Sequence, residues 1–298
     1  MAYFLQQLLN AIPISALYAA LAFGYAIAFS ITKRADVTYG AIFAFAGTTC
    51  LLFADFGWNQ LWLILPATLA LGAAGGIFGG LWAGGFVGRA FMRPLATASP
   101  NAVTVASIGV LIALMESSRL AANTRALWLP PFWNDPIRIW QSGHFTVTTT
   151  SMQIVNSVAF SAMVVTGWLY LQRSRFGRQW KAVSDDPLAA QLLGVDAGRV
   201  FLLSYCAVAL FASVAGVLAT FYYGNMDFGA GLVFGLKIVL ISAAGGYSSP
   251  LICAAGAAVI GLAETLWAGY GPVIWRDAAV LVMLVVWLVV MRSEKGAP

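Results

Sequence analysis

The chain has 298 residues, of which 61% are hydrophobic and only 9% are charged, and its mean hydropathy is +0.84. A soluble domain carries about 25% charged residues, so a soluble core would not bury this much apolar side chain, and lipid is the solvent that fits. The formal charge of +5 does not indicate a nucleic-acid partner, because the basic residues cluster at the ends of apolar runs, as they do in membrane loops.

Cysteine and histidine offer no sign of a reactive centre. Cys50, Cys206 and Cys253 lie inside apolar runs and form no CxxC or Cys/His pattern, so we expect core packing, with no disulfide, metal site or cofactor. The only histidine, His144, has no Ser/Asp arrangement near it, which argues against a membrane enzyme.

A membrane-spanning helix needs roughly 20 mostly apolar residues. Nine runs qualify, and they predict an all-α integral membrane protein, a polytopic helical bundle that forms one domain over residues 1–298. The seventh run is short and flanked by glycine, and the first lacks the cleavage site of a signal peptide, so we expect it to be retained. The runs are 8–31, 37–55, 61–86, 101–120, 153–172, 200–223, 233–246, 251–269 and 276–292.

The positions of lysine and arginine predict the orientation. If the amino terminus lies outside, the inside loops hold 11 of the 16 Lys and Arg residues, as the positive-inside rule favours. Nine spans then place the carboxyl terminus in the cytoplasm. The inside set is Lys33, Arg34, Arg89, Arg93, Arg173, Arg175, Arg178, Lys181, Arg199, Arg292 and Lys295, and the other five are Arg119, Arg125, Arg138, Lys237 and Arg276.

The longer outside loop is predicted at 121–151. It carries Trp128, Trp133 and Trp140, and tryptophan is typical of membrane interfaces. The β-branched run at 145–150 favours a short extended segment. Both an interfacial cap over the bundle and a docking surface for an external partner are compatible with this composition.

The inside loop at 173–199 contains the pattern of a short helix. Polar residues at 184–186 precede Pro187, the order in which caps and a first-turn proline begin a helix. Leucines follow on one face and a glycine ends the run. The helix over 187–193 therefore has an apolar face that needs a partner, unless it folds back on its own bundle or lies on the bilayer. Its cap, apolar face and end are formed by Asp186, Pro187, Leu188, Ala189, Leu192, Leu193 and Gly194.

Ionisable residues inside apolar runs are costly in lipid and tend to face a cavity or a charged partner. Glu264 lies near the middle of the eighth run, and Glu116 lies towards the outer end of the fourth. A glutamate paired with Lys237 is one hypothesis, favoured for Glu264, and Glu116 lining a translocation path is another. We favour an extension of Lys237 to the outer interface. Asp36, beside two cations, is expected to make a local ion pair or to cap a helix.

At residues 177–200 the sequence GRQWKAVSDDPLAAQLLGVDAGRV resembles the cytoplasmic coupling segment of the branched-chain amino acid (hydrophobic amino acid uptake) type of ABC transporter permease subunits. The resemblance continues at 93–117, which begins Arg-Pro-Leu, and at 235–264, so it covers almost the whole chain. The residues in register in the coupling segment are Ala190, Leu192, Leu193, Gly194, Val195, Asp196, Arg199 and Val200.

The resemblance implies one permease subunit of an ATP-driven importer in the bacterial inner membrane. Its partners would be two ATPase subunits, a second permease (related or identical), a periplasmic solute-binding protein and membrane lipid. ATP hydrolysis would belong to the ATPases, and the chain indeed has no G-x-x-x-x-G-K-[ST] motif. The solute would be an amino acid, with amides, urea-like compounds and small carboxylates as alternatives. An ATP-independent secondary transporter or channel is the alternative function.

Some residues depart from the family pattern. Residues 36–40 read Asp-Val-Thr-Tyr-Gly, where the family usually has Asn-Phe-Ala-(His or Gln)-Gly; Glu116 replaces a common Gln, and SSPL at 248–251 replaces the usual Pro-Gly step. These departures bear on the solute. The candidates for a translocation path are Glu116, Tyr39, Lys237 and Glu264. Glycine pairs at 75–76, 79–80, 84–85 and 245–246 are expected to let helices approach closely.

Overall fold

The computed structural model describes residues 2–95, 100–142, 145–244 and 249–295. Helices dominate these ranges, as the composition predicts, and the all-α polytopic bundle is confirmed. His144, the pair at 245–246 and Ser248 lie outside the described residues. The elements are α1 (Ala2–Thr32), α2 (Thr38–Asn59), α3 (Leu65–Val87), a π-helical turn (Gly88–Met92), α4 (Arg93–Leu95), α5 (Pro100–Ala121), β1 (Pro136–Ser142), β2 (Phe145–Thr150), α6 (Ser151–Arg173), α7 (Arg175–Asp185), α8 (Pro187–Leu192), α9 (Ala197–Tyr223), α10 (Ala230–Ala244), α11 (Pro250–Tyr270), a 3-10 turn (Val273–Trp275) and α12 (Arg276–Lys295).

Each predicted apolar run overlaps a helix over most of its described residues. Within the described ranges, seven helical segments are long and apolar enough to cross a membrane: α1, α2, α3 extended to Leu95, α5, α6, α9 and α11. The predicted seventh run coincides with α10, which has only 15 residues, and the ninth coincides with α12. The number of nine full crossings therefore stays a prediction.

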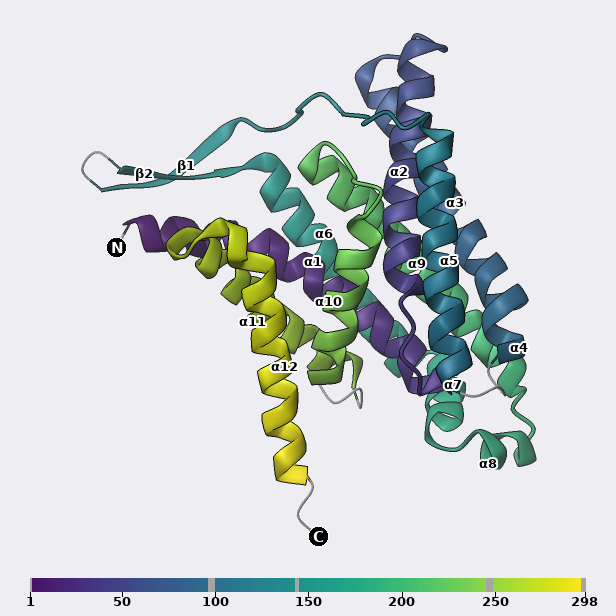
Figure 1. Ribbon diagram of the computed structural model, residues 1–298. Coiled ribbons are helices and arrows are strands. Elements are labelled where there is room, and N and C mark those ends of the chain that lie inside the picture. Colours follow the sequence, from purple (N-terminus) through teal and green to yellow (C-terminus); the bar gives the residue numbers. More distant parts are fainter. Residues whose placement is uncertain (1, 96–99, 143–144, 245–248, 296–298) are drawn as a thin grey trace.

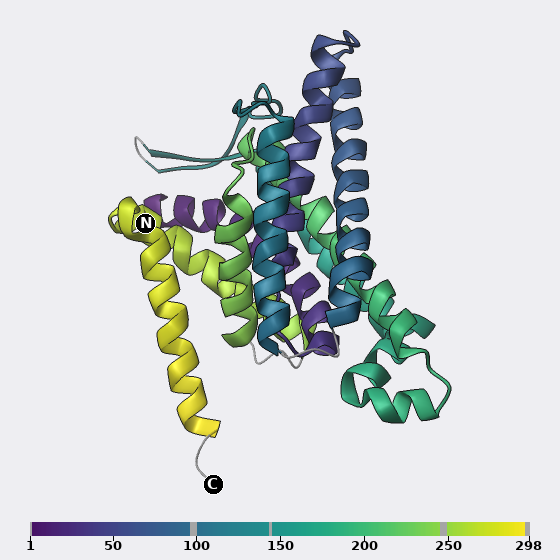
Figure 2. The same cartoon turned by 45° about the vertical axis from the view of Figure 1, so that its right-hand side comes forward.

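The bundle has two distinct ends (Figure 1). The β1–β2 hairpin lies at one end, called the hairpin end, and α7 and α8 lie at the other, called the α8 end. The last turn of α12 lies towards the α8 end, whereas α1 starts on the hairpin side and crosses the bundle obliquely, as Figure 2 also shows. The four segments that carry the predicted inside cations, at 33–34, 89–93, 173–199 and 292–295, all lie towards the α8 end.

Glycine allows α3 to pack closely against α2 and α9. A Cβ at Gly76 would lie 2.7 Å from the carbonyl oxygen of Ala46 on α2 and 2.7 Å from Val217 on α9. Glycines recur every fourth residue along this face, so only small residues fit the contact. The packing predicted for the first two glycine pairs is confirmed. In the third pair only the first glycine is packed, because nothing lies within 4 Å of a Cβ at Gly85.

A second glycine contact joins α2 to α10. A Cβ at Gly40 would lie 2.5 Å from the Cα of Gly235, so the two backbones touch directly. The rings of Phe43 and Phe234 pack beside this contact, with centroids 5.1 Å apart. Helix α10 is thereby held closely against α2 although it is short.

The two predicted loops contain more structure than expected. The extended segment predicted at 145–150 is strand β2, and it pairs in antiparallel fashion with β1, which the sequence analysis missed. The loop at 173–199 contains the predicted short helix as α8 and, before it, the unpredicted helix α7.

Candidate functional site

The start of α8 is fixed by its cap. The backbone N–H groups of Leu188 and Ala189 donate to Oδ1 of Asp186, at 2.8 and 3.0 Å, and Pro187 occupies the first turn. This is the predicted arrangement, with an acceptor for the unpaired N–H groups and no N–H at the proline. The helix ends at Leu192, one residue earlier than predicted, and Gly194 follows with φ of +84°.

The leucine face of α8 is open. Leu188, Leu192 and Leu193 are 73, 90 and 83% exposed. The helix is held instead by Ala190, which is buried in a small cluster with Val183 and Val200. The leucines therefore do not fold back onto their own bundle.

Helix α7 sets the position of α8. Its Trp180 indole N–H donates to the carbonyl oxygen of Ile27 at 3.2 Å, and the Ser184 hydroxyl donates to that of Ser30 at 3.2 Å. Both acceptors lie near the end of α1. These two bonds tie α7, and through it α8, to α1.

A charge network surrounds Lys237 in the middle of α10, with Lys237 and Glu264 buried and Asp277 and Arg276 half-exposed. Nζ of Lys237 donates to Oε1 of Glu264 at 3.0 Å and to Oδ1 of Asp277 at 2.8 Å. The Tyr18 hydroxyl donates to Oε2 of Glu264 at 2.8 Å and lies 3.3 Å from Lys237. Nε of Arg276 is 3.4 Å from Glu264, an ionic contact without the alignment of a hydrogen bond. Two cations thus balance two carboxylates and join α1, α10, α11 and α12.

The pairing of Lys237 with Glu264 matches the first hypothesis for these residues. The favoured extension of Lys237 to the interface is wrong, since its side chain is only 4% exposed. The reason is the supply of acceptors: the ammonium has three donors, and Glu264, Asp277 and Tyr18 accept them within the bundle. The sequence analysis missed Asp277 and Tyr18. The adjacent charges at 276–277, at the same depth as Lys237, were the available signal.

Glu116 lies apart from this network. It pairs with Arg119 one turn along α5 at 2.6 Å, and the two side chains are 41 and 50% exposed. The same face of α5 exposes Ile108 and Ile112. A single copy of the chain therefore covers only one side of the space around Glu116.

Tyr39 and Asp36 lie inside the bundle near the α8 end. The Tyr39 hydroxyl is buried in a notch left by Gly24, with no hydrogen-bond partner among the described residues. One oxygen of Asp36 accepts the Thr38 N–H at 2.8 Å, and the other accepts the Tyr205 hydroxyl at 3.1 Å. Burial raises the pKa of Asp36, partly offset by these bonds. Of the two roles expected for Asp36, the structure favours the helix cap: Asp36 accepts the first N–H of α2 from the position before the N-cap residue, Val37.

Comparisons with known proteins place this architecture. The family model described as branched-chain amino acid transport system / permease component matches residues 7–291. The high-affinity branched-chain amino acid transport system permease protein LivH of Salmonella typhimurium is 28% identical over 296 residues, 98% of this chain and 94% of the relative. The permease protein BraD of Pseudomonas aeruginosa, described in the same words, is 26% identical over 289 residues, 95% and 92% of the two chains.

More distant relatives have other names. The fructose import permease protein FruG of Bifidobacterium longum is 23% identical over 287 residues, 88% of this chain and 76% of the relative. No solved structure gives a significant match. The apolar helices and the bacterial permease relatives indicate a multi-pass inner-membrane protein and a permease component of a transport system. Since the family model spans nearly all of the sequence, the chain belongs to the branched-chain amino acid transport system permease family.

Proposed function

We propose that this chain is one permease subunit of an ATP-driven importer and that α8 is the element that couples it to an ATPase. The open leucine face of α8 carries the proposal, because a rigidly capped helix with three exposed leucines fits an apolar groove on a partner. The chain has no nucleotide-binding motif of the P-loop type, so two ATPase subunits would supply the energy. Residues 173–199 would then lie in the cytoplasm.

The charge distribution supports this orientation. The α8 end holds 11 of the 16 Lys and Arg residues by position, and cations gather on the cytoplasmic side. The amino terminus and the loop at 121–151 would lie on the periplasmic side, with the carboxyl terminus in the cytoplasm. A periplasmic solute-binding protein would deliver the solute there. The whole chain would act as a single permease domain.

The solute we propose is an amino acid or a related small polar molecule, as the names of LivH and BraD suggest. Glu116 is our candidate for the translocation path. A charged pair on an apolar, half-exposed helix face is costly in lipid, so it is expected to face water between two permease subunits. A second permease, related or identical, would supply the opposite wall. For Tyr39, Lys237 and Glu264 a direct solute contact is disfavoured by their burial.

The coupling role is tested by copurification with the cognate ATPases. Leu192→Asp is compared with Gln191→Asp, because both positions are exposed and gain the same carboxylate. We expect the ATPases to be lost from the first variant and retained by the second, and the double variant Leu192→Asp/Leu193→Asp to lose them completely. Equal recovery from all variants would refute coupling through α8. Transport by the wild-type chain in ATP-free vesicles would instead support a secondary transporter.

The path assignment is tested by Glu116→Gln. The variant should assemble normally, because the pair is exposed and such pairs contribute only about 0–1 kcal/mol to stability. Uptake of the solute should change in KM or in rate. Ser117→Ala, at an exposed neighbouring position, is the control. Uptake kinetics identical to wild type would remove Glu116 from the path.

A further inference from the structure

The β1–β2 hairpin has two chemically different faces. Residues paired across an antiparallel ladder point to the same side of the sheet, and successive residues point to opposite sides. Trp140 pairs with Val147, and Ile137 pairs with Thr149. On the opposite face, Arg138 pairs with Thr148, and Gln141 pairs with Thr146. A bulge at Ile139 keeps this separation along β1.

The first of these faces is turned towards the bundle. Val147 is fully buried, and Thr149 is only 8% exposed. The ring of Phe145, two residues from Val147 on the same side, packs edge-on against Tyr3 of α1 at 6.3 Å. The face that carries Arg138 and Gln141 therefore points away from the bundle.

The hairpin is held rigidly in this position. The side-chain amide of Gln6 on α1 donates to the carbonyl oxygen of Thr148 at 2.8 Å and accepts its N–H at 2.9 Å. Thr150 and Gln153 form a reciprocal cap where β2 enters α6. The second half of the β2 backbone is thus fixed to α1 and α6.

The far strand nevertheless leaves its apolar side chains uncovered. Ile137 is 43% exposed and Trp140 is 47% exposed, although they lie on the same face as buried Val147. Figures 1 and 2 show that the hairpin extends sideways beyond the bundle instead of standing up from it. The uncovered part of this face therefore lies beside the helices, at the depth of their ends.

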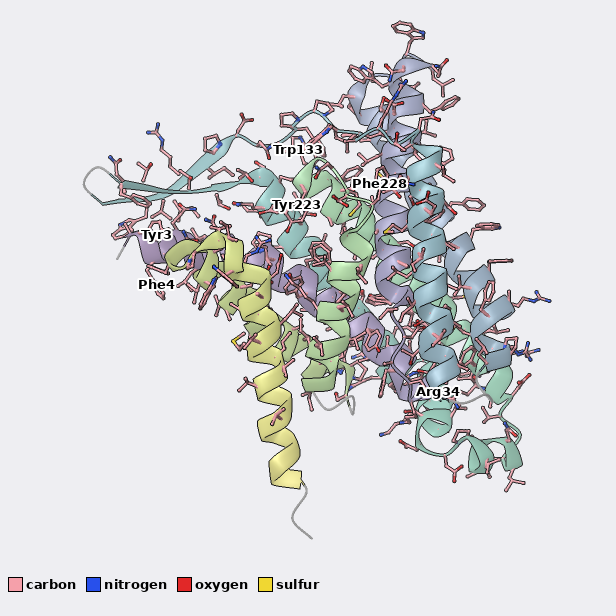
Figure 3. The ribbon with its side chains drawn as sticks, in the orientation of Figure 1. Tyr3, Phe4, Arg34, Trp133, Tyr223 and Phe228 are labelled. Carbon is pink, nitrogen blue, oxygen red and sulfur yellow. The ribbon has the colours of Figure 1, made fainter. Side chains whose placement is uncertain are left out.

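Aromatic side chains mark this depth on the neighbouring elements. Tyr3, Phe4, Tyr270 and Trp275 are all more than two-fifths exposed, and Figure 3 shows Tyr3 and Phe4 below the hairpin at the start of α1. Exposed aromatic residues at one level form the belt typical of a membrane–water interface.

We propose that the hairpin lies flat on the lipid surface beside the bundle, with Ile137 and Trp140 inserted between headgroups and Arg138 and Gln141 in water. A protein approaching along the membrane normal meets the face that carries Arg138 and Gln141. Lipid is the partner that matches the inward face, because that face is apolar, carries an aromatic residue and overhangs the helices at belt depth. The hairpin would thus limit the tilt of α1, to which Gln6 anchors it.

Neighbouring positions on opposite faces allow a direct test. Cys50 and Cys253 are buried and Cys206 is exposed; all three are replaced by alanine or serine. Trp140→Cys and Gln141→Cys are then labelled with a small fluorophore in the full-length protein. The labelled proteins are placed in vesicles of phosphatidylethanolamine and phosphatidylglycerol, and quenching by lipids brominated near the headgroup is compared with quenching by aqueous iodide.

We expect lipid quenching to dominate at 140 and iodide quenching to dominate at 141. The proposal is overturned if iodide quenches both positions equally, because the hairpin would then stand in water. It is also overturned if position 140 is quenched by iodide in the permease alone and is protected only when a second permease or a solute-binding protein is added. That result would identify the face as a protein interface.

Discussion

Two halves of the bundle are held together by opposite chemistry. In the half formed by α2, α3 and α9, glycine and alanine let the backbones touch, and the contact at Gly76 leaves no room for a side chain. In the half formed by α1, α10, α11 and α12, four helices meet at one charge network around the buried pair of Lys237 and Glu264. Lipid offers no hydrophobic drive for helix association, so each half depends on a contact that lipid cannot replace.

The difference predicts how each half responds to change. The stabilisation from close packing is distributed over many van der Waals contacts, so a substitution at one position removes only the contribution of that position. A charge network concentrates its energy in a few atoms, and removing one partner leaves the others buried and unpaired. Helix α12 depends most on the network, because Val280 and Leu284 are its only buried residues in the part whose side chains the structure describes.

The largest loss of stability is expected for Lys237→Met. The substitution leaves Glu264 without its main donor in a buried site, which costs about 3–5 kcal/mol. Thermal unfolding of the detergent-solubilised protein should show a markedly lower midpoint. Arg276→Gln is the matched control, because its side chain is 41% exposed and its loss should have a small effect. Similar midpoints for the two variants would mean that the network does not hold the helices.

A smaller but still large loss is expected for Gly76→Leu. The added side chain meets the Ala46 carbonyl and Val217, and overpacking of this kind costs about 1–3 kcal/mol or more. Gly85→Leu adds the same volume where nothing lies within 4 Å and should leave the protein intact. The yield of monodisperse protein in size-exclusion chromatography distinguishes the two. If both variants elute like wild type, close packing of α3 is not required.

The sequence predicts the packed half better than the charged half. A glycine at every fourth position implies a close helix contact from spacing alone, and the structure confirms it at Gly76 and Gly80. The partners of Lys237 depend on how each helix is rotated about its axis and tilted against its neighbours. The spacing of residues within one segment does not encode these angles. Tyr18 lies 219 residues from Lys237 in sequence, and only the oblique course of α1 brings it to the site.

The same reasoning explains the outcomes at the bundle ends. The cap and end of α8 follow from local residue order, so Asp186, Pro187 and Gly194 were predicted. Helix α7 and strand β1 were missed because their partners are distant: Trp180 bonds to α1, and β1 is defined by its pairing with β2. The exposed position of Glu116 depends on the rotation of α5 about its axis, which the sequence likewise does not determine.

The smallest effect, expected for Tyr18→Phe, sharpens the comparison most. The substitution removes the hydroxyl that donates to Glu264 at 2.8 Å, but Lys237 still donates to the same oxygen at 3.1 Å. The cost should therefore be about 1 kcal/mol, seen as a small shift of the unfolding midpoint. In the Lys237→Met background Tyr18 becomes the main remaining donor to Glu264, so the same substitution should cost clearly more there. A double-mutant cycle measures this coupling. Strictly additive losses of stability would show that independent bonds join the four helices. The stabilising energy of the charged half would then be distributed over separate contacts, as it is in the packed half.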